Sequence, residues 1–125
     1  MTAGPGAPDR RRSLGQLGED RAAQWYLSHG FEVVARNWRC PQGEIDIVAN
    51  KGGLVVFSEV KTRSSLRFGQ PFEAVGPDKQ RRLRRLAAAW LRSNSRHSAG
   101  DAPFEVRFDV VSVTPGTVDV IESAF

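Results

Sequence analysis

The sequence predicts a single α/β domain in which a β-sheet is flanked by helices. The chain of 125 residues fits one domain of common size and is long enough to bury a core. Five segments have the apolar patterns typical of strands, and two others place apolar residues at helical spacing. The predicted order of elements is helix, three strands, helix, two strands (α-β-β-β-α-β-β).

The first predicted helix follows an irregular N-terminal segment. Residues 1–12 are rich in Gly, Pro and Arg and show no periodicity, so we expect a disordered tail there and the domain over residues 13–125. Ser13 and Gln16 form a capping-box pattern that begins a helix. Its predicted apolar stripe consists of Leu14, Leu17, Ala22 and Trp25.

Three strands are predicted next, over residues 31–37, 44–49 and 54–61. The residues Asn50-Lys51-Gly52-Gly53 have the composition of a hairpin turn between the second and third strands. A hairpin centred on Lys51-Gly52 sets Asp46 opposite Phe57 and Glu44 opposite Glu59.

The second half of the chain predicts a helix and two strands. Residues 62–78 are expected to form a loop with room for one short helical turn. A helix follows from near Pro77 to residue 92, since proline suits the first turn. Its predicted buried stripe is Leu83, Leu86, Ala87, Trp90 and Leu91. After a polar stretch, strands are predicted over residues 104–113 and 118–121.

Charged residues interrupt the otherwise apolar third strand. Alternate side chains of a strand share a face, so Glu59 and Lys61 project together with Val55 and Phe57. In the expected hairpin register Asp46 lies on that same face. Diagonal neighbours across an antiparallel pair lie about 7–8 Å apart, and one divalent cation can bridge two carboxylates over that gap.

Such a trio suits phosphodiester hydrolysis. Asp46 and Glu59 are predicted ligands of Mg²⁺ or Mn²⁺, and the backbone carbonyl of Val60 can supply another oxygen. Lys61 is predicted to position or deprotonate the attacking water, because a low-dielectric site can lower the pKa of a lysine toward neutrality. The alternative is a solvated strand edge or an ion pair with no chemical role.

These residues also carry a resemblance. Asp46 followed by Glu59-Val60-Lys61 resembles the active-site motif of the PD-(D/E)xK nuclease superfamily, which includes many restriction enzymes and Holliday-junction resolvases. Over about residues 14–113 a longer ordered set resembles the YraN-like family of small bacterial proteins. That set is Gly18-Glu19, Arg36-Asn37 with Arg39, Gly43-Glu44-Ile45-Asp46, Phe57-Ser58-Glu59-Val60-Lys61-Thr62-Arg63 and Arg107-Phe108-Asp109-Val110.

The resemblance implies a restriction-endonuclease-like fold, with a mixed sheet flanked by helices, and a metal-dependent nuclease of DNA repair or recombination. It also implies that Glu19, from the first helix, approaches the site as a further acidic residue. By its angle on the helix Glu19 lies at the margin of the apolar stripe. An ordinary solvated glutamate with no role at the site is therefore an alternative. Glu44 is expected to point into the same face and to support the metal ligands without contacting the metal itself. The sequence departs from the family pattern at Ser58, where the family usually has an aliphatic residue. Ser58 lies on the face opposite Glu59, so the departure concerns packing more than catalysis.

The charge distribution points to a nucleic-acid partner. Residues 61–96 hold ten basic and two acidic residues, a net charge of +8, whereas residues 97–125 have a net charge of −4. Arginines outnumber lysines fifteen to three, so codon bias and a solvated helix face are alternatives. The residues predicted to contact DNA phosphates are Arg63, Gln70, Arg81, Arg85 and Arg92.

Other classes of protein are disfavoured. The sequence has no apolar run long enough to cross a bilayer and no signal-peptide core, and its one cysteine, Cys40, cannot form an intramolecular disulfide. We therefore expect a cytoplasmic nuclease that acts on DNA. Branched or single-stranded DNA is a possible substrate, and a homodimer is a possible assembly. Two other hypotheses are a nuclease fold that binds nucleic acid or a repair protein without cutting, and a structural protein whose charges form only ion pairs.

Overall fold

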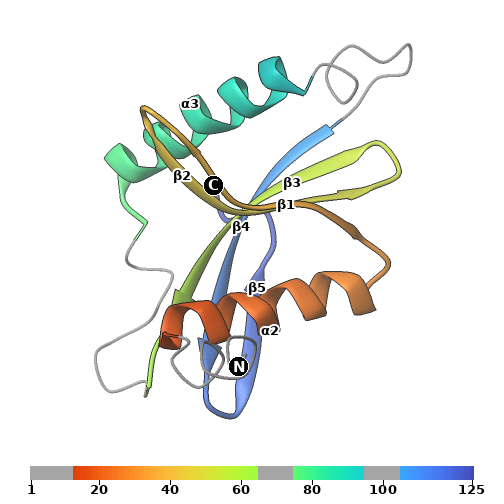
Figure 1. Cartoon of the computed structure of the whole chain (residues 1–125), viewed down its shortest axis with the longest axis vertical. Coiled ribbons are helices and arrows are strands. Elements are labelled where there is room, and N and C mark those ends of the chain that lie inside the picture. The colour runs from red at the N-terminus through yellow and green to blue at the C-terminus, as the bar shows by residue number, and fades with distance from the viewer. Residues whose placement is uncertain (1–12, 65–74, 95–104) are drawn as a thin grey trace, which may run out of the picture.

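A computed structural model of the chain describes residues 13–64, 75–94 and 105–125. These residues form two helices and one sheet of five strands, in the order α-β-β-β-α-β-β (Figure 1). The elements are α2 (Leu14–Ser28), β1 (Glu32–Cys40), β2 (Gly43–Lys51), β3 (Leu54–Thr62), α3 (Pro77–Ser93), β4 (Glu105–Thr114) and β5 (Thr117–Ile121). The expected tail and the stretch before β4 lie outside the described residues, as does most of the expected loop before α3.

The sheet is mixed, as predicted. Its strand order is β1-β2-β3-β4-β5, and only the β3–β4 pair is parallel. A parallel pair requires a crossover connection, and α3 lies in it. The helices α2 and α3 lie on opposite faces of the sheet (Figure 1). This architecture confirms the predicted fold class and is consistent with a restriction-endonuclease-like fold.

The helix α2 begins as predicted but buries a different stripe. Ser13 Oγ accepts from Gln16 N at 3.1 Å and Gln16 Oε1 accepts from Ser13 N at 3.1 Å, which completes the capping box. The stripe prediction was wrong at its N-terminal end, since Leu14 and Leu17 are 52% and 47% exposed. The helix instead packs through Gly18, Glu19, Ala22, Ala23 and Tyr26.

The helix α3 buries the predicted stripe. Leu83, Leu86, Ala87 and Trp90 pack with Val55 and Phe57 of β3, and Leu91 is partly buried against them. Trp90 is therefore a core residue. No helix in the described ranges is long and apolar enough to span a bilayer.

The register of the β2–β3 hairpin differs from the prediction. Lys51 pairs with Leu54, so the two-residue turn is Gly52-Gly53, with Gly52 at a φ of +61° that glycine adopts readily. Each partner is consequently shifted by two residues, and Val48 instead of Asp46 faces Phe57. Within the paired residues 47–51 and 54–58 a shift of two leaves the predicted faces unchanged, because side chains alternate with a period of two. Ile45 packs in the same cluster as Val48 and Phe57, so this alternation does not continue through Asp46.

The β2–β3 pairing stops before the two strands end. It runs from Lys51–Leu54 to Ile47–Ser58, beyond which the start of β2 pairs only with β1 and the end of β3 only with β4. Figure 1 shows the two strands diverging there, with the β1–β2 hairpin running toward α3. We call this opening, bounded by residues 43–46 and 59–62, the fork.

A buried polar network supports the face of β3 that α2 covers. Tyr26 Oη lies 2.9 Å from Ser58 Oγ and donates to Asp109 Oδ2 at 2.7 Å. Arg107 donates to both oxygens of Asp109, at 2.8 and 3.0 Å. Ser58 is thus a satisfied buried hydroxyl.

Candidate functional site

Asp46 and Glu59 lie on the two sides of the fork. Asp46 Oδ2 accepts a hydrogen bond of 2.8 Å from the N–H of Val60. A side-chain carboxylate therefore satisfies a backbone donor of β3 just where the strand ladder ends. This bond holds the Asp46 carboxylate next to the residue that follows Glu59.

The surroundings of Asp46 disfavour its charged form. Burial raises the pKa of Asp46 to about 6; the hydrogen bond from Val60 opposes this shift, and the nearby carboxylates of Glu59, Glu19 and Glu44 add to it. Repulsion from these neighbouring carboxylates disfavours a charged Asp46, and a bound cation would relieve that repulsion.

Glu59 is held by two lysines. Its side chain is 11% exposed, and Oε2 contacts the Nζ of Lys61 at 2.9 Å and the Nζ of Lys79. Burial opposes ionisation of Glu59, but the contacts with Lys79 and Lys61 outweigh it and hold its pKa below the ordinary value. Sequence reasoning did not select Lys79, because its side chain reaches the fork only through the packing of α3 on the sheet.

The two lysines differ in their electrostatics. Burial lowers the pKa of Lys61, but the ion pair with the Glu59 carboxylate outweighs burial and leaves this pKa above the ordinary value. Burial, together with the Lys61 ammonium, lowers the pKa of Lys79. The expectation that the site lowers the pKa of Lys61 was therefore wrong for this structure, because the Glu59 carboxylate stabilises its charged form.

Glu19 reaches the fork from α2. It is 7% exposed, and its Oε1 accepts from Asn37 Nδ2 at 2.7 Å and from the Arg36 guanidinium at 3.3 and 3.4 Å. Asn37 has a φ of +52° and lies between Arg36 and Trp38, whose partners Ile47 and Ile45 flank Asp46. Glu19 is therefore not a solvated helix residue; it is a buried carboxylate tied to the strand beside Asp46.

Glu44 lies nearer the rim of the fork. It pairs with the exposed Arg39 at 3.7 Å, and its charge contributes to the raised pKa of Asp46. A role in direct ligation stays a prediction.

The donors at the fork fit a hard cation in their chemistry. Mg²⁺ typically takes one or two carboxylates and completes its octahedron with water or substrate oxygens, and Asp46 and Glu59 offer such a pair. Among residues 13–64, 75–94 and 105–125 no group of three or more His, Cys, Asp or Glu is arranged to hold a metal ion. The contact seen for Val60 is through its N–H, and ligation by its carbonyl stays a prediction.

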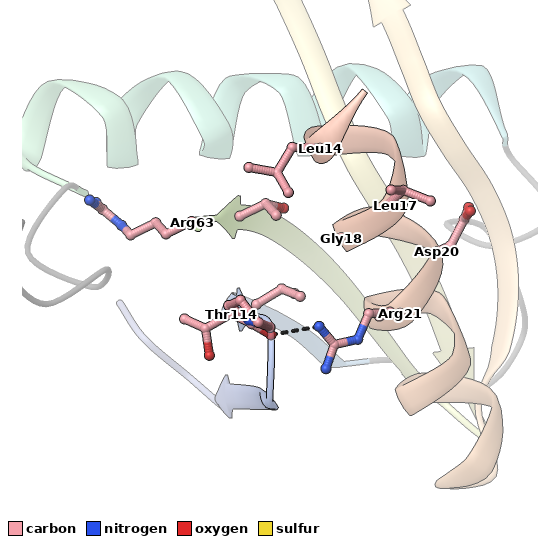
Figure 2. A pocket seen from close by; sticks show the side chains of 10 residues that line it. Leu14, Leu17, Gly18, Asp20, Arg21, Arg63 and Thr114 are labelled. Atoms are coloured by element: carbon pink, nitrogen blue, oxygen red, sulfur yellow. Dashed lines mark hydrogen bonds between the residues drawn. The ribbon is translucent and has the colours of Figure 1, made fainter. Parts of the chain in front are cut away.

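Arg63 leaves the sheet just beyond Lys61. Its N–H donates to Val113 O at 2.9 Å, and its buried Nε has no hydrogen-bond partner among the described residues. Figure 2 shows Arg63 extending past the end of β3, whereas Arg21 turns from α2 to donate to Thr114 O at 2.6 Å. Both residues line a mostly apolar cavity of about 430 Å³ with Leu14 and Leu17. Gln70 lies outside the described residues.

The arginines predicted to contact DNA lie on the exposed face of α3. Arg81, Arg85 and Arg92 are exposed, and Arg81 pairs with Asp78 of the same helix. Arg85 and Arg92 line a shallow hollow of about 290 Å³ with Gln42. No contact in the structure tests their predicted binding to phosphates.

Comparison with known proteins gives one consistent match. The sequence model of the uncharacterised protein family UPF0102 matches residues 18–113. A UPF0102 protein of Beutenbergia cavernae is 54% identical over 101 residues, which cover 81% of each chain. A UPF0102 protein of Streptomyces griseus is 53% identical over 103 residues (82% of this chain and 83% of the relative), and one of Rhodococcus opacus is 49% identical over 104 residues (83% and 84%).

Proposed function

The chain belongs to the uncharacterised protein family UPF0102, and we propose that it is a metal-dependent nuclease that hydrolyses DNA phosphodiester bonds in DNA repair or recombination. The observation that carries this proposal is the fork, where a sheet opens to bring two half-buried carboxylates and a lysine together. Charged groups held in such positions cluster at active sites.

Four side chains at the fork have proposed roles. Asp46 and Glu59 would hold Mg²⁺ or Mn²⁺, which would supply neutralisation of the charge that builds on the phosphate. Lys61, paired with Glu59 at 2.9 Å, positions the attacking water as an ammonium donor. Glu19 helps as an auxiliary acidic group, oriented by Asn37.

A cleavage assay with Mg²⁺ or Mn²⁺ on duplex, single-stranded, flap and four-way-junction DNA tests this function. Asp46→Asn and Glu59→Gln should abolish cleavage but preserve DNA binding, because each change removes a ligand and also an anion that repels phosphates. Lys61→Arg should slow cleavage by about a hundredfold, since a planar guanidinium cannot replace a compact ammonium. Full cleavage by either carboxamide variant would refute the assignment of these carboxylates.

One observation favours a second candidate function. Glu59 already carries two ammonium groups, an arrangement that also suits a nuclease fold that binds nucleic acid or a repair protein without cutting it. DNA binding by the wild-type chain without cleavage of any of the four substrates would select this alternative.

A further inference from the structure

Lys79 contacts Glu59 at the fork but has no role in the proposed mechanism. It lies in the first turn of α3, and its Nζ contacts the same Glu59 oxygen that Lys61 contacts. The side chains of Lys61 and Lys79 are 23% and 24% exposed, so water screens the two ammonium groups only in part.

A second ammonium is more than Glu59 needs for charge balance. Lys61 lies two residues away on the same face of β3, so strand geometry alone brings it to Glu59. Lys79 adds a like charge beside Lys61, and like charges at one acceptor repel each other. Together the two ammonium groups place two positive charges on one carboxylate, which is the charge of a divalent cation.

The two contacts also differ in how they can open. The Lys61 contact lies within one strand, whereas the Lys79 contact joins α3 to β3 across the fork. Rotation of the long Lys79 side chain breaks the second contact, removes the repulsion between the two ammonium groups and leaves the Lys61 contact in place. A cation that approaches Asp46 and Glu59 can thus displace Lys79 while Lys61 stays paired with Glu59.

From this geometry we propose that Lys79 forms an ion pair with Glu59 in the metal-free protein and competes with the divalent cation for that carboxylate. This inference rests on the proposed metal site of the nuclease. It makes the affinity of the fork for metal a balance between the cation and a side chain of the neighbouring helix.

Mn²⁺ binding to the full-length protein without DNA, measured by titration calorimetry and by the electron paramagnetic resonance of free Mn²⁺, tests the proposal. Lys79→Met keeps the length of the side chain but removes its charge, and it should tighten Mn²⁺ binding by about tenfold. Arg82→Met removes one charge from an exposed position of the same helix and should change the affinity by less than about twofold.

A double variant shows whether the gain passes through Glu59. In the Glu59→Gln background, Lys79→Met should give no gain in Mn²⁺ affinity, because the contested carboxylate is absent. A thermal unfolding curve of each variant identifies any loss of folding, and Lys79→Gln replaces Lys79→Met if the latter does not fold.

The outcomes separate this inference from the proposed function. Wild-type protein that binds Mn²⁺ with an affinity unchanged or weakened by Lys79→Met would overturn the role of Lys79 and leave the nuclease proposal intact. Absence of Mn²⁺ binding in the wild type and in Lys79→Met alike would overturn both.

Discussion

At the scale of a single residue, Asp46 is held by a hydrogen bond in surroundings that disfavour its charge. The Val60 N–H fixes its carboxylate, while burial and neighbouring acids raise its pKa from 3.8 to about 6. A carboxyl whose pKa is higher in the folded state contributes stability that is fully present below its unfolded pKa. That contribution is lost as pH rises through about 6. Charged Asp46 therefore destabilises the metal-free fold at neutral pH.

Asp46→Asn should consequently stabilise the metal-free protein, and the gain should depend on pH. An amide can accept the Val60 hydrogen bond without the cost of a buried charge. The free energy of unfolding should rise relative to wild type by up to about 3 kcal/mol at pH 7.5 and by little at pH 4. Urea denaturation in EDTA at both pH values measures this difference.

Glu59→Gln provides a control of opposite sign. Because its lysine contacts lower the pKa of Glu59, that carboxylate stabilises the fold above its unfolded pKa and loses this effect in acid. Its replacement should therefore destabilise the protein at pH 7.5 more than at pH 4. A gain for Asp46→Asn of equal size at both pH values would contradict the raised pKa.

The residues of the site were predictable to different degrees. Glu59 and Lys61 could be found from strand periodicity, which a two-residue error in register does not disturb. Asp46 could be selected from its place in the hairpin, but its bond to the Val60 N–H could not, because the pairing of the strands ends at Ile47–Ser58. Lys79 was missed because nothing in the local sequence of α3 says which strand it meets. Glu19 came only from resemblance, since the capping pattern cannot indicate that Asn37 would turn toward it.

At the scale of elements, the contact between α2 and β3 brings Glu19 to the fork. Gly18 permits this contact, because a Cβ there would lie 1.9 Å from Thr62 Oγ1 and 2.8 Å from Thr62 Cβ. Such distances require the backbone to shift. The helix α2 can therefore pack closely on β3 because Gly18, the residue before Glu19, has no side chain.

Gly18→Ala should destabilise the fold by about 1–3 kcal/mol through overpacking and should displace Glu19 from Asn37. Gly15→Ala is the matched control in the same helix: its Cβ would lie 3.8 Å from Ser13 Oγ, and it should stabilise the helix by up to about 1 kcal/mol. Chemical denaturation of both variants tests the pair. Equal effects would mean that helix propensity alone, and not the contact with Thr62, sets the stability.

The elements themselves were predicted more accurately than their ends and pairing. Apolar periodicity gave the order and type of all seven described elements. The β1–β2 hairpin extends beyond the predicted strands to Cys40 and Gly43, since the residues after 37, such as the exposed Arg39, lack a strand pattern. The stripe of α2 was misassigned because Leu14 and Leu17 lie along an open cavity and not against the sheet.

At the scale of the whole molecule, α3 connects the fork to the basic surface. Lys79 reaches Glu59 near the start of the helix, and the exposed Arg81, Arg85 and Arg92 continue along it. The stretch of α-helix from Arg81 to Arg92 spans about 16 Å, enough for several phosphates of a bound strand. The core stripe of Leu83, Leu86 and Trp90 lies on the opposite side of the helix.

Replacing Arg81, Arg85 and Arg92 together by Gln should weaken DNA binding equally for all sequences, because phosphate contacts carry no base information. The slope of log affinity against log salt should flatten by up to about 0.9 for each phosphate that the variant no longer neutralises, as measured by titrations at several salt concentrations. Thermal unfolding should change little, since the buried stripe is untouched.

The matched control replaces Arg10, Arg11 and Arg12, which lie outside the described residues, and removes the same charge from elsewhere in the chain. An unchanged slope in the α3 variant, or an equal flattening in both, would show that the α3 arginines form a solvated face and that the DNA path runs elsewhere from the fork.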